Sequence, residues 1–283
     1  MKIFIPTCDK TSFILDLTIY LYKKFIPNIE KIIILGFSKP ALKEWSNIEF
    51  VSLSPEQTSI NLWSKYLYNY FANIQDELIW LSLDDFLPIN NINIDCYNAA
   101  VDYMKNNKIG LCTISQTIYY ESKDYRKPGK CIEGEKYFIY ERNKKDLYNI
   151  SLQPGLWNRE YLCKIFNNNF TPWDVEIKGT KKSYTLPYIN IGTCRGPRDN
   201  ITSLMEFSYV SSLSSKWNPY INFQGFPLEL IKEIIDNKLV NKDLITIGDP
   251  YDKIVFNPDV HDKFFFRNLH KYGGDHDFFL KNY

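Results

Sequence analysis

Short apolar runs rich in β-branched residues alternate with longer segments of helical period, and this alternation constrains the fold more than any other feature of the sequence. The runs at 2–6, 31–37 and 48–54 are of the first kind, and the segments 13–25 and 59–74 are of the second. Strands separated by helices of this length predict βαβ units and a largely parallel sheet that is covered on both faces. Ligands of such sheets bind beyond the carboxyl ends of the strands.

The strand predicted at 78–83 ends on two adjacent carboxylates, Asp84 and Asp85. Because an unpaired charge is costly to bury, we expect both side chains to lie where the strand leaves the core. Paired carboxylates suit a hard cation such as Mn²⁺ or Mg²⁺, which takes oxygen ligands and is commonly shared with substrate phosphates. A solvated turn at the strand end explains the same two residues without a metal.

The composition excludes several classes of protein. The chain has 283 residues, and its 34 Lys and Arg nearly balance its 33 Asp and Glu, so it has no field of one sign to steer it onto nucleic acid. Its six cysteines are scattered without zinc-ligand spacing and are expected to be reduced thiols. No apolar run approaches the ~20 residues of a membrane span. These features predict a cytoplasmic protein.

A second set of residues suited to ligand binding begins at the Gln-Pro-Gly sequence of 153–155. We expect a tight turn there, with exposed backbone amides, before a helix at 158–166. Trp157 and Trp173 offer apolar faces on which a sugar ring could stack. Filling the core is the alternative role of either tryptophan.

Two carboxylates follow Trp173 closely. An apolar setting would raise the pKa of Glu176 and suit it to act as a general base. If 172–177 is a strand, Asp174 and Glu176 point to one face and either could reach an acceptor.

Five segments in a fixed order carry a resemblance to a known family. They are PTCDK after the first strand, LWSKYLYNYFANI, IWLSLDDFLP, SLQPGLW and TPWDVE. Over roughly residues 1–195 the chain resembles a family of small bacterial and viral glycosyltransferases of the GT-A fold. The resemblance implies a Rossmann-like three-layer αβα sandwich at 1–199. Beyond the resemblance, the pattern of residues 200–283 predicts a mostly helical extension, which we expect to pack on that domain and to be able to contribute to the acceptor site.

The resemblance also implies roles for residues that bind the donor. The loop after the first strand would hold the nucleotide base through Thr7 and Asp9. Asp85 would coordinate Mn²⁺ or Mg²⁺, with Asp84 nearer the ribose or sugar, although the sequence departs from a strict Asp-x-Asp motif. Gln153 would form hydrogen bonds with hydroxyls of the donor sugar, and Trp157 would form a wall of the sugar site.

Glu176 occupies the place of the catalytic base in inverting members of that family, with Asp174 as the fallback. Arg195, in a glycine-containing turn, would assist at the diphosphate, although a solvated surface turn explains it equally. His276 would complete the metal site, in competition with His261 and His270 or as part of an ordinary polar turn.

The tail at 263–283 mixes aromatic and basic residues. It would contact a membrane surface bearing a lipid-linked acceptor, stack on a polymer acceptor, or pack its aromatics against the main domain.

The sequence therefore predicts a nucleotide-sugar-dependent glycosyltransferase of polysaccharide biosynthesis, acting on a glycan, lipid-linked or protein-linked acceptor. Two alternatives stay open. A sugar nucleotidyltransferase usually has a glycine-rich loop after its first strand, whereas PTCDKTS has no glycine. A noncatalytic nucleotide- or carbohydrate-binding module would share the fold without the reaction.

Overall fold

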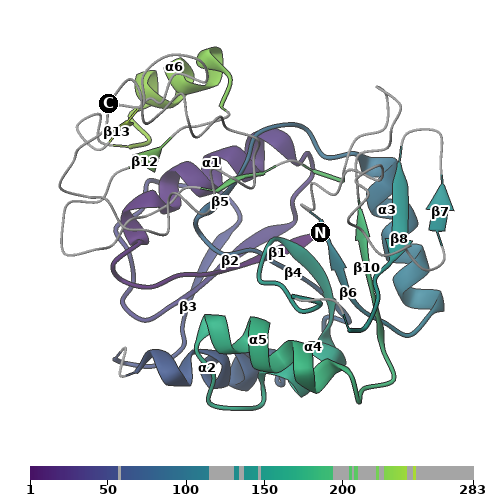
Figure 1. The fold of residues 1–283 in the computed structure, drawn as a ribbon. Helices are drawn as coiled ribbons and strands as arrows, with labels where there is room; N and C mark the ends of the chain where they lie inside the picture. Colours follow the sequence, from purple (N-terminus) through teal and green to yellow (C-terminus); the bar gives the residue numbers. More distant parts are fainter. Residues whose placement is uncertain are drawn as a thin grey trace, which may run out of the picture.

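The computed structural model shows a central sheet between two layers of helices (Figure 1). It describes residues 1–56, 59–114, 131–133, 137–145, 148–193, 204–205, 207–209, 221–222, 226–240 and 245–246. The predicted Rossmann-type α/β sandwich with a mostly parallel central sheet, as in GT-A-like folds, is confirmed.

The central sheet has nine strands. Their order is β3 (Ile48–Ser52), β2 (Lys31–Gly36), β1 (Lys2–Pro6), β4 (Leu78–Leu81), β9 (Gly155–Asn158), β6 (Ile109–Thr113), β10 (Ile189–Thr193), β8 (Phe138–Glu141) and β7 (Cys131–Glu133). The first four are mutually parallel, and β6 is parallel to β10. Because β9 is antiparallel to both β4 and β6, the carboxyl ends of β1, β4 and β6 share one edge with the start of β9.

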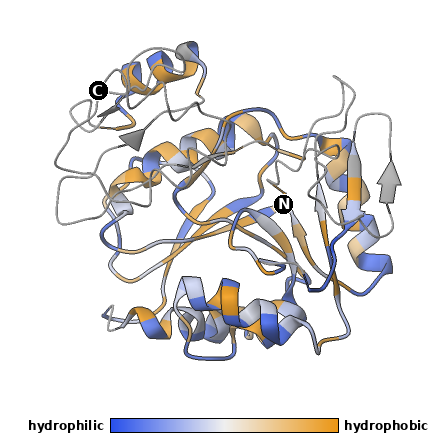
Figure 2. Ribbon diagram, in the orientation of Figure 1, coloured by the Kyte–Doolittle hydropathy of each residue, from blue (hydrophilic) through white to orange (hydrophobic). Residues whose placement is uncertain are grey.

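Helices cover both faces of this sheet (Figure 1). One face packs against α1 (Leu15–Phe25), α3 (Ile94–Asn106) and α6 (Leu228–Asp236), and the other against α2 (Trp63–Phe71), α4 (Arg159–Phe166) and α5 (Pro172–Ser183). Alternate residues of β1 serve the two faces, since Ile3 and Ile5 join the first core and Phe4 the second. Figure 2 shows apolar residues along the strands and on the helix sides turned toward them. Among the described residues, no helix is both long and apolar enough to cross a bilayer.

The described segments beyond residue 200 contact the rest of the chain. Strand β11 (Phe207–Tyr209) pairs antiparallel with β5 (Phe86–Pro88), which follows the two aspartates. Helix α6 packs on α1, where Lys24 Nζ lies 2.6 Å from a Glu233 oxygen. Strand β12 (Ile221–Asn222) pairs with β13 (Ile245–Thr246). Strands thus accompany the predicted helix in this region, and the division of the chain at 199 stays a prediction.

Around the second motif the structure places one strand that was not predicted and a helix where a strand was considered. A strand, β9, lies between the Gln-Pro-Gly turn and α4. The segment 172–177 is not a strand but the start of α5, because Thr171 caps the helix. Its side chain accepts a hydrogen bond from the Asp174 amide at 3.0 Å, while the Asp174 carboxylate accepts one from the Thr171 amide at 3.3 Å. Pro172 occupies the first turn, where its missing N–H costs nothing.

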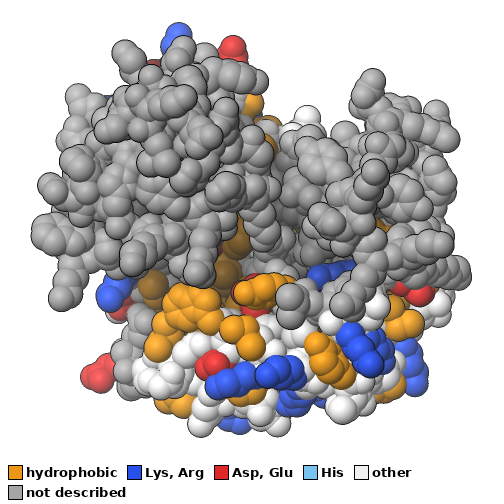
Figure 3. Space-filling model, in the orientation of Figure 1, with side chains coloured by type: hydrophobic (Ala, Val, Ile, Leu, Met, Phe, Trp, Pro, Cys, Tyr) orange, Lys and Arg blue, Asp and Glu red, His pale blue; other side chains and the backbone are white. Residues whose placement is uncertain are grey.

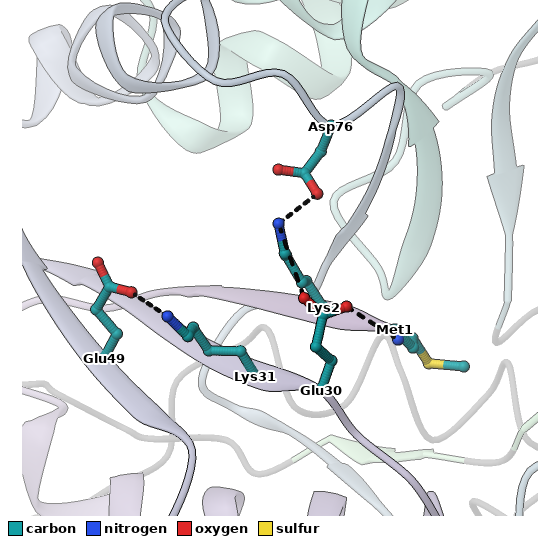
Figure 4. A network of polar contacts seen from close by, with 6 residues as sticks. All are labelled: Met1, Lys2, Glu30, Lys31, Glu49 and Asp76. Carbon is teal, nitrogen blue, oxygen red and sulfur yellow. Dashed lines mark hydrogen bonds and ion pairs between the residues drawn. The ribbon is translucent and has the colours of Figure 1, made fainter.

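The amino edge of the parallel strands carries ion pairs (Figure 4). Lys2 Nζ lies 2.9 Å from Asp76 Oδ1, and Lys31 Nζ lies 2.9 Å from Glu49 Oε2. The N-terminal amino group lies 3.7 Å from Glu30. These side chains are partly or largely exposed, so each pair contributes at most about 1 kcal/mol.

The packing of the sheet against α4 is close at Gly110 in β6, and a substitution there can test it. A Cβ at this position would lie 2.7 Å from Cγ of the buried Tyr161 ring. We therefore expect Gly110→Ala to lower the free energy of unfolding by about 1–3 kcal/mol, measured by urea denaturation. In a Tyr161→Val background the same change should cost clearly less. An equal cost in both backgrounds would contradict the steric explanation.

Candidate functional site

Three loops leave the sheet side by side at its carboxyl edge. Phe4 of β1 is in register with Leu81 of β4, and Leu81 is in register with Gly155 of β9. The loop after β1, the loop after β4 and the segment before β9 therefore emerge from neighbouring strands. These loops carry the residues at 7–11, 82–85 and 151–154, so the fold brings together motifs that are far apart in sequence.

Asp84 joins the first two loops. Its Oδ2 accepts hydrogen bonds from the hydroxyls of Thr7, at 2.6 Å, and Thr11, while its backbone carbonyl accepts one from Thr18 Oγ1 at 3.0 Å. The residue is buried, and desolvation raises the pKa of its carboxyl, against the opposing effect of the two hydroxyls. These contacts give Asp84 a role in positioning the loops, and its contact with the ribose, the sugar or the metal stays a prediction.

Asp85 is half-buried at the point where the chain turns into β5. Within the described ranges no cluster of three or more His, Cys, Asp or Glu side chains could hold a metal ion. A single carboxylate is nevertheless compatible with Mn²⁺ or Mg²⁺, because these ions are commonly held by one or two carboxylates together with substrate phosphates. The residues present thus fit a metal that arrives with a diphosphate, and coordination by Asp85 stays a prediction.

Thr7 and Asp9 lie at the predicted position after β1, but both make contacts within the protein. The Thr7 hydroxyl donates to Asp84. The Asp9 carboxylate accepts hydrogen bonds from the Ser38 amide at 3.0 Å and from the Ser38 hydroxyl at 2.7 Å, which ties this loop to the one after β2. These contacts shape the loop, and contact with a nucleotide base stays a prediction for both residues.

Glu176 is half-buried on α5, and its side chain reaches the segment before β9. Its Oε1 accepts hydrogen bonds from the Leu152 amide at 2.8 Å and the Ser151 hydroxyl at 3.3 Å. Burial raises the pKa of the carboxyl above its ordinary value, and the two hydrogen bonds only partly oppose this. A carboxylate with a raised pKa at the edge of a ligand site is suited to general base catalysis.

Asp174 has the opposite electrostatic environment. It lies in the capping box of α5, and its Oδ1 is 2.8 Å from Lys178 Nζ, which lowers the pKa of the carboxyl. Two residues on a helix are separated by about 200° of rotation, so Asp174 and Glu176 do not share a face. The structure therefore disfavours the fallback base.

The two predicted contacts to the donor sugar differ in their outcome. Trp157 is fully buried between the sheet and α4, stacked on Tyr161 and edge-on to Phe166, so the prediction that it walls the sugar was wrong. Its position in β9 sends the ring into the core. Gln153 has a buried Oε1 without a hydrogen-bond partner among the described residues. Such an atom requires a donor from water or from a ligand hydroxyl.

Sequence reasoning missed several residues that shape the site. Thr11 and Thr18 were detectable as polar side chains close to or within the apolar face of a helix. Ser151 precedes the turn motif without any signal of its own. Arg142 is buried and donates to Thr113 Oγ1 at 3.3 Å, and also to the backbone carbonyls of 148 and 149. Arg195 and His276 lie outside the described residues.

Comparison with known proteins adds a distant likeness of fold. No protein-family model and no curated protein matches the chain. Among solved structures, S. aureus TarS 1–349 is 11% identical with a TM-score of 0.42, over 70% of this chain and 58% of that one. A second structure, of S. aureus TarS, is 12% identical with a TM-score of 0.40, over 70% of this chain and 35% of that one. This likeness is too distant to transfer residues or chemistry.

The hydrogen bonds to Asp84 predict a large effect on stability. Asp84→Ala removes the carboxylate that the Thr7 and Thr11 hydroxyls share and leaves them the more distant Cys8 carbonyl, so we expect the free energy of unfolding to fall by about 2–4 kcal/mol. The neighbouring Asp85→Ala removes the same formal charge without affecting these two hydroxyls, and it should cost clearly less. Chemical denaturation of both variants makes the comparison, and equal losses would show that Asp84 does not hold the loops together.

The raised pKa of Glu176 predicts a pH-dependent effect of Glu176→Gln. A carboxyl with a folded-state pKa above its unfolded value favours the protonated form in the folded state, so its ionisation costs stability above the folded pKa. Glutamine keeps the acceptor for the Leu152 amide and cannot ionise. The variant should therefore melt at or above the wild-type temperature at pH 7, with the gain disappearing below about pH 4.3. A lower melting temperature at pH 7 would contradict the burial argument.

Proposed function

We propose that the chain is a glycosyltransferase that moves a sugar from a nucleoside-diphosphate donor to a hydroxyl of a glycan, lipid-linked or protein-linked acceptor, with inversion. One observation carries the proposal. Glu176, with a pKa raised by burial, and Asp85 both lie at the sheet edge where β4 ends and the antiparallel β9 begins. This reaction needs from the protein a base for the acceptor and a carboxylate for the metal that would bind the diphosphate.

The proton transfer is assigned to Glu176. Both of its hydrogen bonds end on Oε1, which leaves Oε2 to take the proton of the acceptor hydroxyl. As that proton leaves, the acceptor oxygen forms a bond to the anomeric carbon, and the bond from that carbon to the diphosphate oxygen breaks. The electron pair departs with the nucleoside diphosphate. A pKa above the usual carboxylate range makes Glu176 a stronger base for this step.

The donor is assigned to the loops of β1 and β4 and to Gln153. Asp85 would hold Mn²⁺ or Mg²⁺, which when bound neutralises charge on the leaving diphosphate. Asp84 positions this loop through Thr7 and Thr11. The buried Gln153 Oε1 would accept a hydrogen bond from a donor-sugar hydroxyl, which supplies the partner that the described residues do not provide. Arg195 and His276 remain proposed contributors to the diphosphate and metal contacts.

Thermal shift with nucleotides tests the donor assignment. UDP, GDP and dTDP, with CMP as a control, would each be added with and without Mn²⁺. We expect one diphosphate to stabilise the protein in a metal-dependent way, by about 2.7 kcal/mol at a concentration one hundred times its dissociation constant. Asp85→Ala should remove the shift. A full shift in that variant would exclude Asp85 as the metal ligand, and no shift with any nucleotide would exclude the donor class.

The role of Glu176 as the base is tested by measuring sugar transfer from the donor whose nucleotide the thermal shift identifies. Glu176→Gln should keep the nucleotide-induced shift and lose about 10²–10⁴-fold in transfer. Glu49→Gln is the matched control, because it makes the same chemical change at the amino edge of the sheet. Wild-type transfer by Glu176→Gln would contradict the mechanism. Donor binding by the wild-type protein without transfer or donor hydrolysis would indicate the noncatalytic binding module.

A further inference from the structure

Large hydrophobic side chains are exposed in a row along α5. Trp173 is 64% exposed, Ile177 52% and Tyr184 39%, and their spacing places them on one side of the helix. Three of the seven exposed large hydrophobics in the described part of the chain therefore gather here, which is not the scattered distribution of an ordinary surface.

The outward side of the same helix is basic. Lys178 and Lys181 are exposed on this side, whereas the half-buried Lys182 lies about 180° around the helix from Trp173. The only carboxylate of α5 on this side, Asp174, is paired with Lys178 at 2.8 Å. In Figure 3, Lys and Arg side chains and hydrophobic side chains lie next to one another across the layer that contains α5 and α4. We call the surface formed by Trp173, Ile177, Tyr184, Lys178 and Lys181 the α5 face.

We propose that the α5 face binds the headgroup region of an anionic lipid bilayer. Tryptophan and tyrosine favour this region, because the body of the ring is apolar and its N–H or O–H stays hydrated. The lysines complement the negative charge of the lipid surface. A neutral saccharide would use the aromatic rings but would gain little from the lysines, and an apolar protein partner would have to desolvate them. The combination of both kinds of side chain on one helix is typical of an interfacial surface.

This docking would place the candidate site at the membrane. Trp173 and Glu176 are three residues apart on α5, and such residues are neighbours on the helix surface. Glu176 points inward to the Leu152 amide, while Trp173 points to solvent. Contact of Trp173 with a bilayer would thus hold the base close to the headgroups, where a lipid-linked acceptor presents its hydroxyl. That consequence rests on the proposed function, whereas the lipid contact itself does not.

Cosedimentation of the full chain with vesicles tests the contact without any measurement of activity. The vesicles would be pure POPC and a 3:1 mixture of POPC and POPG, each at low and high NaCl. We expect binding to the anionic vesicles alone, weakened by salt. Trp173→Ala and Ile177→Ser should each weaken binding about tenfold. Lys181→Gln should weaken it roughly fivefold.

Matched controls come from α3, on the opposite face of the sheet. Ile94, 49% exposed, is comparable to Ile177, and Lys105 is an exposed lysine like Lys181. Ile94→Ser and Lys105→Gln should bind vesicles like the wild type, and unchanged melting temperatures would show that all variants are folded. No binding of the wild-type protein, or equal binding by the α5 and control variants, would overturn the proposal. Trp173-dependent retention on an oligosaccharide array without vesicle binding would overturn it in favour of a soluble glycan.

Discussion

The buried carboxylate of Asp84 is the interaction on which the arrangement of the candidate site depends. Two threonine hydroxyls donate to one of its oxygens, and a third threonine, in α1, donates to its backbone carbonyl. The loop after β1, the loop after β4 and helix α1 therefore meet at one residue. A charge in this position is tolerated because its donors replace much of the water it loses. Asp85, the next residue, is consequently held at the edge of the sheet by contacts that its neighbour makes.

The two carboxylates of α5, Asp174 and Glu176, also have different roles. Asp174 stabilises the start of the helix through its capping box and its pair with Lys178, and both interactions favour its charged form. Glu176 lies against the segment before β9, where burial disfavours its charged form. Residues of similar chemistry, two positions apart, thus have pKa values shifted in opposite directions. The rotation of the helix produces this difference, because it places one side chain at the helix start and sends the other inward.

The roles of two tryptophans also depend on the direction in which their side chains point. The side chain of Trp157 in β9 points into the core and packs on Tyr161. The side chain of Trp173, in the first turn of α5, points to solvent. Residue type alone therefore did not distinguish a packing residue from one available to a ligand or a surface. The interpretation of Trp173 as part of a lipid-facing surface comes from its exposed neighbours and from the lysines on the same helix.

By itself, the sequence determined the alternation of strands and helices, the parallel sheet and the edge at which its polar residues gather, because periodicity and apolar runs are local properties. It also contained the signal for α5, since Thr171, Pro172 and Asp174 form a capping sequence that outweighs a strand interpretation. Only the tertiary structure decided that Asp84 binds Thr7 and Thr11, that Glu176 reaches Leu152 and that Trp157 is buried. These outcomes depend on which faces meet between segments far apart in the chain, and a single sequence does not encode that geometry in its local pattern.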